Sequence, residues 1–309
     1  MATIAKRRRS PMFWIAVIFC STATLALLVG GGIFLLAREI ANPTRDPENQ
    51  VVRLIEKEDW DALEKLAAEA TAEPKRTENG VWRIAQFYES LGNLDRTRDR
   101  IEMQLLLEKL QRWEQARPDS LPAKLMRAKM HTEIGWTVRG GGYANTVSEA
   151  DWAIFGQHMD TAWNLVEPLA KRPDANVVVY DTLLDLGVAR GVSREKMEEL
   201  LAAGRAIEPG YEPLYEAYIW YLLPRWYGEH GDAHKFALRV LGEEGEERYA
   251  HLGACLRERE PGIVQYMFLG DAYLSGLESL VGRYPQNRDY VNAYFAALVF
   301  FGKREEARA

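Results

Sequence analysis

The chain has 309 residues, of which 47% are hydrophobic and 27% are charged. These proportions are typical of a globular protein with a sizeable core and exclude a largely disordered chain. The formal net charge is −6, and residues 1–37 carry four basic and no acidic side chains, so the remainder of the chain is at −10. An acidic soluble part argues against a nucleic-acid partner, because phosphate binding needs clustered lysine and arginine.

The segment from Phe13 to Ala37 contains no charged residue over 25 positions. About 20 apolar residues are enough for a helix to cross a bilayer core. A cleaved signal peptide has a shorter apolar region of roughly 7–15 residues. We therefore expect residues 13–37 to form a single transmembrane helix.

The flanking charges predict the orientation of this helix. Residues 1–12 contain the basic run Lys6, Arg7, Arg8 and Arg9, whereas acidic side chains follow the apolar segment. By the positive-inside rule, residues 1–12 are then a cytoplasmic basic tail. The expected location is the bacterial inner (cytoplasmic) membrane, crossed once, with the soluble domain extracytoplasmic.

After a polar linker at residues 38–47, residues 48–309 are predicted to form an all-α domain of ten to thirteen short helices. Apolar residues recur there at helical spacing, with almost no sustained period-two alternation. In the clearest helix, Ser148 is the N-cap and Pro168 interrupts the last turn. Its apolar stripe consists of Trp152, Phe155, Met159, Ala162, Trp163, Val166 and Leu169.

Four glycines, Gly92, Gly191, Gly231 and Gly302, each follow an apolar helix and precede a charged one. They are 99, 40 and 71 residues apart, close to three, one and two units of the roughly 34-residue tetratricopeptide (TPR) repeat. Residues 176–209 match one unit best, although no unit carries the full TPR pattern. We expect a TPR-like α-solenoid of irregular helical hairpins, with an irregular helical bundle as the alternative.

Two stretches in the middle of the chain depart from this pattern. Residues 135–148 include three consecutive glycines, Gly140 to Gly142, and predict a loop with unusual backbone freedom. This loop is not a phosphate-binding loop, because no Gly-Lys-Ser/Thr follows it. Residues 209–228 are rich in tyrosine and tryptophan.

These stretches resemble a bacterial TPR-like family of unknown function. The resemblance lies in the Trp136…Arg139-Gly-Gly-Gly-Tyr143-Ala loop, the helix that starts at Ser148, and the Tyr221-Leu-Leu-Pro-Arg225-Trp226 stretch. It covers roughly residues 130–235. The resemblance implies an α-solenoid-like fold, and it implies no established activity and no catalytic residues.

The same stretches supply the candidate partner-binding residues, which are Trp136, Arg139, Tyr143, Tyr221, Arg225 and Trp226. One hypothesis is a shared pocket in which the arginines stack on aromatic rings and bind a carboxylate or a peptide carbonyl. The alternative is that both arginines cap helix C-termini and fix the loops to the solenoid.

We find no convincing catalytic motif. His230 and His234 have i,i+4 spacing but lack the glutamate of a His-Glu-x-x-His site, and neither Gly-x-Ser-x-Gly nor Cys-x-x-Cys occurs. The carboxylates are spread along helix faces as a solvated charge run would be. Cys255 lies far from Cys20, and we expect it to be a small buried apolar residue. We therefore expect no catalytic residue, no metal and no cofactor.

The sequence thus favours a membrane-anchored protein–protein interaction or scaffold module that is not an enzyme. Its expected partners are a protein or peptide, and the lipid bilayer through residues 13–37. One alternative is a subunit of a larger membrane complex, and another is an envelope hydrolase that uses paired carboxylates. An acidic cleft with a carboxylate of raised pKa would favour the hydrolase, whereas a groove lined by Arg, Tyr and Trp would favour binding.

Overall fold

The computed structural model describes residues 47–91, 100–142, 144–259, 267–268, 270–303 and 307. The chain divides into two units, residues 1–50 and 51–309, and the second unit contains every helix below except the first residues of α2. The expected cytoplasmic tail, the expected span at 13–37 and residues 38–46 of the linker lie outside the described residues. Within the described part, no helix combines the length and hydrophobicity that crossing a bilayer requires.

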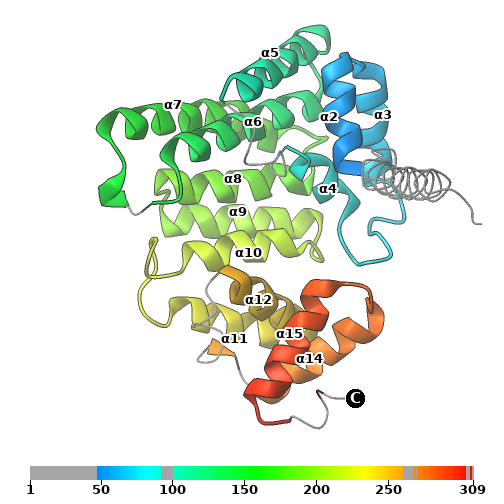
Figure 1. Cartoon of the computed structure of the whole chain (residues 1–309), viewed down its shortest axis with the longest axis vertical. Helices are drawn as coiled ribbons and strands as arrows, with labels where there is room; N and C mark the ends of the chain where they lie inside the picture. The colour runs from blue at the N-terminus through cyan, green and yellow to red at the C-terminus, as the bar shows by residue number, and fades with distance from the viewer. Residues whose placement is uncertain are drawn as a thin grey trace, which may run out of the picture. The chain divides into compact units, whose positions relative to one another are not determined.

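The described residues form thirteen α-helices and two short 3₁₀ helices (Figure 1), which confirms the predicted all-α class. The α-helices are α2 (Pro47–Lys57), α3 (Trp60–Thr71), α4 (Arg83–Glu89), α5 (Arg100–Ala116), α6 (Leu121–Arg139), α7 (Glu149–Val166), α8 (Val177–Arg190), α9 (Arg194–Ile207), α10 (Glu212–Tyr221), α11 (Asp232–Glu244), α12 (Glu246–Arg259), α14 (Gly270–Arg283) and α15 (Arg288–Phe300). The 3₁₀ helices are η1 (Ala144–Thr146) and η2 (Glu167–Lys171).

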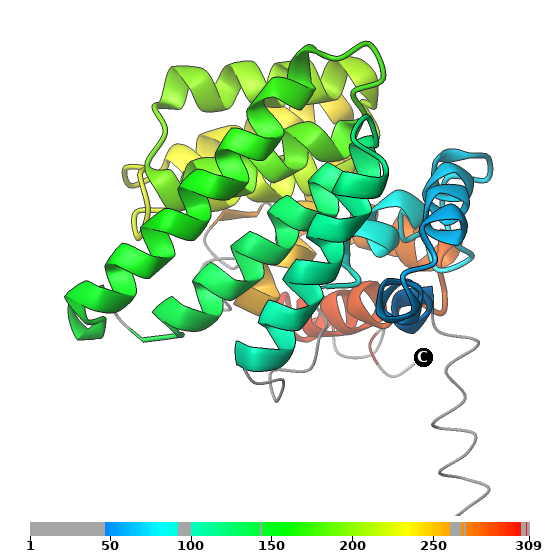
Figure 2. The same ribbon diagram turned by 90° about the horizontal axis from the view of Figure 1, so that it is seen from above.

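Helices α4, α6, α8, α10 and α12 form a layer in which each helix contacts the next. We call these five helices the inner layer. Helices α5, α7, α9 and α11 pack against it, each beside its neighbours in sequence. Figure 1 shows α6 to α10 side by side, and Figure 2 gives the view down the stack. Helical hairpins that stack in this way bury apolar faces that no hairpin could bury alone.

The helical hairpin predicted at residues 176–209 is present as α8 and α9. The side chain of Asn176 caps the start of α8, and Ser193 caps the start of α9. Gly191 ends α8 with φ +67°, a left-handed conformation that glycine adopts without strain. Gly231 and Gly302 also have positive φ, whereas Gly92 lies outside the described residues.

Helix α7 also begins and ends as predicted. The hydroxyl of Ser148 accepts a hydrogen bond from the Asp151 amide at 3.1 Å. The helix stops at Val166 and continues as η2, which contains Pro168. One side of the predicted stripe faces the core, while Trp152 is 37% exposed.

The loop at 135–148 is shorter than predicted, because α6 extends to Arg139 and Trp136 therefore lies on a helix.

Helices α6 and α7 carry a pair of histidines that contact each other. The Nδ1 atoms of His131 and His158 lie 3.0 Å apart, so one ring donates a hydrogen bond and the other accepts it. Burial, the neighbouring His158 and Arg127 together lower the pKa of His131 to about 4. Burial also lowers the pKa of His158. The pair therefore stays neutral in the folded protein well below the pH at which a free histidine is protonated.

This pair predicts that the protein loses stability in mild acid. Because the folded pKa of His131 lies below the unfolded value of about 6.5, the stabilisation is complete above pH 6.5 and decreases as the pH falls towards 4. After a discount for the partly exposed ring, the loss is on the order of 2 kcal/mol. We expect thermal unfolding of the chain to show this loss between pH 7 and pH 4. It should be much smaller in a His131→Phe/His158→Phe double variant and unchanged in His230→Gln. Equal pH dependence in all three proteins would contradict the assignment.

Candidate ligand-binding cleft

A cleft of about 320 Å³ lies between the loop that precedes α4 and the helices α10, α12 and α15. We call residues 75–82 the latch loop. It is closed by an antiparallel bridge between Arg76 and Trp82, and by a hydrogen bond from the Thr77 amide to the Val81 carbonyl. The cleft is lined by Arg76, Gly80, Val81, Trp82, Ala85, Glu89, Glu212, Pro213, Glu216, His251, Ala254, Cys255, Asn287, Asp289 and Tyr290.

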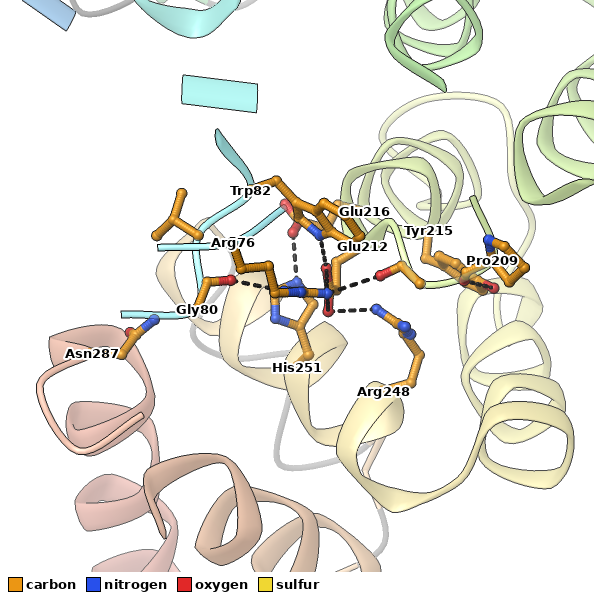
Figure 3. A network of polar contacts seen from close by, with 12 residues as sticks. Arg76, Gly80, Trp82, Pro209, Glu212, Tyr215, Glu216, Arg248, His251 and Asn287 are labelled. Carbon is orange, nitrogen blue, oxygen red and sulfur yellow. Dashed lines mark hydrogen bonds and ion pairs between the residues drawn. The ribbon is translucent and has the colours of Figure 1, made fainter. Parts of the chain in front are cut away.

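Glu212, the first residue of α10, is the centre of the polar network beside the cleft (Figure 3). Arg76 Nη2 lies 2.7 and 2.8 Å from its two carboxylate oxygens, and Trp82 Nε1 donates to Oε2 at 2.5 Å. On the other side, Arg248 of α12 forms an ion pair with Oε1 at 2.6 Å. Glu212 is only 8% exposed. This one carboxylate therefore joins the latch loop to two helices of the inner layer.

The charge of Glu212 is maintained by its partners. Burial by itself raises the pKa of this carboxyl group, but His251, Arg248 and Arg76 outweigh burial and lower the pKa. Arg76 also lies over the Trp82 ring, 4.1 Å from its centroid. A buried charge is tolerated only when it is paired and hydrogen-bonded in this way.

The latch loop also contacts the turn between α14 and α15. Asn287 Nδ2 donates a hydrogen bond to the Asn79 carbonyl at 3.0 Å, across 208 positions of sequence. Gly80, with φ +82°, lies against the Tyr284 ring, where any Cβ would come within 2.9 Å of the ring. A side chain at position 80 would therefore clash, and glycine is required for this close approach.

A second polar group lies on the α10 and α12 side of the cleft. His251 Nε2 lies 2.6 Å from Glu216 Oε1, and its Nδ1 lies 2.8 Å from the Tyr290 hydroxyl. The thiol of Cys255 donates to the other oxygen of Glu216 at 3.1 Å. The expectation that Cys255 is a buried apolar residue is therefore wrong, because it is half-buried and its thiol has a carboxylate partner.

Carboxylates from several inner-layer helices interact with one another beside this group. Burial raises the pKa of Asp181 well above its usual range, Asp185 raises it further, and Lys129 opposes the shift. Burial also raises the pKa of Glu133. Burial alone would lower the pKa of Lys129, but the carboxylates around it raise it. The expectation of carboxylates spread along solvated helix faces therefore fails at these positions.

The structure brings four of the six predicted partner-binding residues together at another place. Trp136 and Trp226 meet edge to face, with centroids 6.2 Å apart. Arg139 lies 5.5 Å from the Trp136 centroid, and Arg225 lies 5.9 Å from the Trp226 centroid. Arg139 also donates to the carbonyls of Gly140 and Gly142. The stacking agrees with the pocket hypothesis, and the carbonyl contacts agree with the capping alternative.

Of the other two predicted residues, Tyr221 does not join this cluster. Tyr221 is buried and donates its hydroxyl to the Val192 carbonyl at 3.0 Å. Tyr143 lies outside the described residues.

The cleft residues were not predicted from sequence, since Arg76 and Arg248 lie far from Glu212 along the chain. A weak local signal exists at Glu212, whose acidic side chain in the first turn favours a helix start.

Comparison with protein-family models, with curated proteins and with solved structures finds no match to this chain. Within the residues that the structure covers, no group of three or more His, Cys, Asp or Glu side chains is arranged to hold a metal ion. The candidate site therefore rests on the geometry of the cleft.

The network at Glu212 predicts a large stability loss when its charge is removed. Glu212→Gln leaves two arginines next to a buried neutral amide, and breaking a buried ion pair typically costs about 3–5 kcal/mol. Chemical denaturation should show this decrease in the free energy of unfolding. Glu208→Gln is the matched control, because Glu208 pairs with exposed Lys75 of the same loop. An equal effect of both substitutions would show that Glu212 is not the centre of the network.

Proposed function

We propose that this chain is a membrane-anchored scaffold or protein–protein interaction module. In this proposal residues 13–37 cross the bacterial inner membrane with residues 1–12 in the cytoplasm. Residues 48–309 form an extracytoplasmic TPR-like α-solenoid that binds a partner polypeptide. The tether raises the concentration of the module at the membrane, which favours binding without any new contact.

The observation that carries this proposal is the cleft between the latch loop and the inner layer. Stacked helical hairpins offer extended surfaces that take peptide segments. A volume of about 320 Å³ is at the low end for ligand pockets. It therefore suits side chains of an extended segment better than a folded domain. The polar atoms of His251, Glu216 and Asn287 along its walls can orient such a segment.

The arginine–tryptophan cluster is a second contact surface in this proposal. Tryptophan and arginine are the residue types most enriched at energetic hot spots of protein interfaces. Arg225 is exposed and lies 5.2 Å from the centroid of Trp220 as well as beside Trp226. This surface would extend the binding of a partner that first engages the cleft.

A carboxylate-dependent envelope hydrolase is the second candidate function. The raised pKa values of Asp181 and Glu133 favour it, because a general acid must stay protonated near neutral pH. Asp181, however, is only 4% exposed and does not line the cleft. A subunit role within a larger membrane complex is compatible with the same surfaces as the scaffold proposal.

The scaffold proposal can be tested by site-specific photo-crosslinking of the full chain in native membranes. Val81 lines the cleft and is 38% exposed, so a photo-reactive residue there should give an adduct of defined mass. Phe295 on α15 is exposed away from the cleft lining and serves as the control position. Adducts at position 295 but not at 81 would contradict partner binding at the cleft. Extraction of the chain by alkaline carbonate would contradict the anchor.

The role of the second surface can be tested with Arg139→Ala and Arg225→Ala separately. If these arginines bind the partner, both variants should melt close to the parent chain while the yield of the Val81 adduct falls several-fold. If they only cap the loops, melting temperatures should fall while the adduct yield is retained. A large stability loss with full crosslinking would overturn the binding role.

A further inference from the structure

Helix α15, the last described helix, exposes an apolar stripe on its outer face. Val291 is 39% exposed, Phe295 is 55% exposed and Val299 is 42% exposed. These residues follow one another at steps of four, so they lie on one face of the helix. No other described helix exposes three large hydrophobic side chains at this spacing. A contiguous apolar stripe of this kind on a surface marks an interaction site.

The opposite face of α15 is already used by the fold. Tyr290, Ala293 and Ala297 are buried on that face, and the helix packs mainly on α14 and α12 (Figure 1). A helix that is apolar on both faces is normally covered on both. The terminal unit of a stacked helical array instead has a polar outer face. The outer stripe of α15 therefore indicates a covering partner.

The stripe matches itself when two copies of the helix run antiparallel. Phe295 lies at its centre, and Val291 and Val299 lie four residues away on either side. A two-fold axis through Phe295 therefore places Phe295 against its own counterpart and Val291 against the partner's Val299. Side chains at steps of four form the ridges that interlock in the commonest class of helix packing.

The charges of α15 agree with this arrangement. Arg288 lies three residues before Val291, so it extends the stripe at the start of the helix. The same two-fold axis places Arg288 near the C-terminal end of the second helix, where the helix dipole is negative. No charged residue occurs from 290 to 302, so two copies of this acidic chain can approach there without like-charge contacts. A lipid surface fits less well, because interfacial helices carry lysine and arginine beside their apolar face.

We propose that a second copy of this chain covers the outer face of α15, with the two helices antiparallel and Phe295 on the two-fold axis. A helix of 13 residues is about 20 Å long. Three side chains along this length bury less than the roughly 800 Å² per partner of a standard interface. The pairing is therefore weak between free molecules, and it is favoured when the proposed anchor holds both copies in one membrane. The inference goes beyond the proposed function and rests on it only for this tether.

Disulfide crosslinking of the full chain in native membranes tests both the pairing and its register. The background is Cys20→Ser/Cys255→Ser, in which position 255 keeps a hydrogen-bond donor. The test variants add Phe295→Cys, Val291→Cys or Val291→Cys/Val299→Cys. The matched control adds Leu238→Cys, because Leu238 on α11 is 37% exposed and thus as accessible as Val291.

We expect Phe295→Cys to give a disulfide-linked species of twice the chain mass. Val291→Cys alone should give at least about fivefold less, because eight residues of helix, about 12 Å, separate the two copies of position 291, whereas a disulfide needs Cα atoms within about 7 Å. Val291→Cys/Val299→Cys should restore the yield, since these positions face each other across the axis. Leu238→Cys should give only the low yield of random collisions.

A charge on the axis gives a second readout of the same contact. Adding Phe295→Glu to the Val291→Cys/Val299→Cys variant places two carboxylates against each other, so the disulfide yield should fall at least about tenfold. Adding Leu238→Glu instead should leave the yield unchanged. Both additions should leave the melting temperature close to that of the parent chain, because positions 295 and 238 are exposed within one copy.

Three outcomes would contradict the pairing. Equal yields from Phe295→Cys and Leu238→Cys would show random collision of tethered chains. A higher yield from Val291→Cys than from Phe295→Cys would exclude the antiparallel register. A crosslink from position 295 to a protein of another mass would assign the face to a different partner. The scaffold proposal is judged separately, by the Val81 adduct and by carbonate extraction of the parent chain, so either proposal can fail while the other stands.

Discussion

The arrangement of the described unit depends on how one buried carboxylate is neutralised. Glu212 is almost inaccessible to water, and a lone charge there would be strongly unfavourable. It is stabilised because Arg76 and Trp82 approach from the latch loop while Arg248 approaches from α12. Each of these partners contributes to the compensation of the same buried carboxylate. The geometry of the cleft follows, since its walls are the segments that this carboxylate holds together.

Much of the helical architecture could be predicted because its determinants are local. The cap at Ser148, the apolar stripe behind it and the left-handed turn at Gly191 each depend on a few neighbouring residues. The end of α6 could not be placed in the same way. Its last turn carries Trp136 and Arg139 next to a glycine run, and this composition favours a loop when read locally. In the structure α6 extends through Trp136 to Arg139. There the ring of Trp136 packs on Phe155 of α7, with ring centroids 4.9 Å apart.

The candidate cleft could not be predicted because its residues share no local pattern. Arg76, Glu212 and Arg248 look like ordinary charged positions until the latch loop, α10 and α12 come together. The sequence did predict that Trp136, Arg139, Arg225 and Trp226 lie together. The two segments that contain them, residues 135–148 and 209–228, are both unusual and both combine arginine with aromatic residues. Tyr221 lies close to Arg225 and Trp226 in the sequence, but its position on α10 turns its side chain into the core. Helical periodicity separates neighbours along the chain onto different faces.

The contacts of the latch loop also determine which part of the unit can finish folding last. Most helix contacts join neighbours in sequence or next-but-one helices, and such local contacts form early in folding. The latch loop instead requires Glu212, Arg248 and Asn287, which are made long after residues 75–82. During synthesis, which proceeds at about 5–20 residues per second, the loop must wait roughly ten seconds or more for these partners. The N-terminal helices therefore spend that interval without their closing contacts, and the emerging chain acquires its cleft only when its last hairpin is in place.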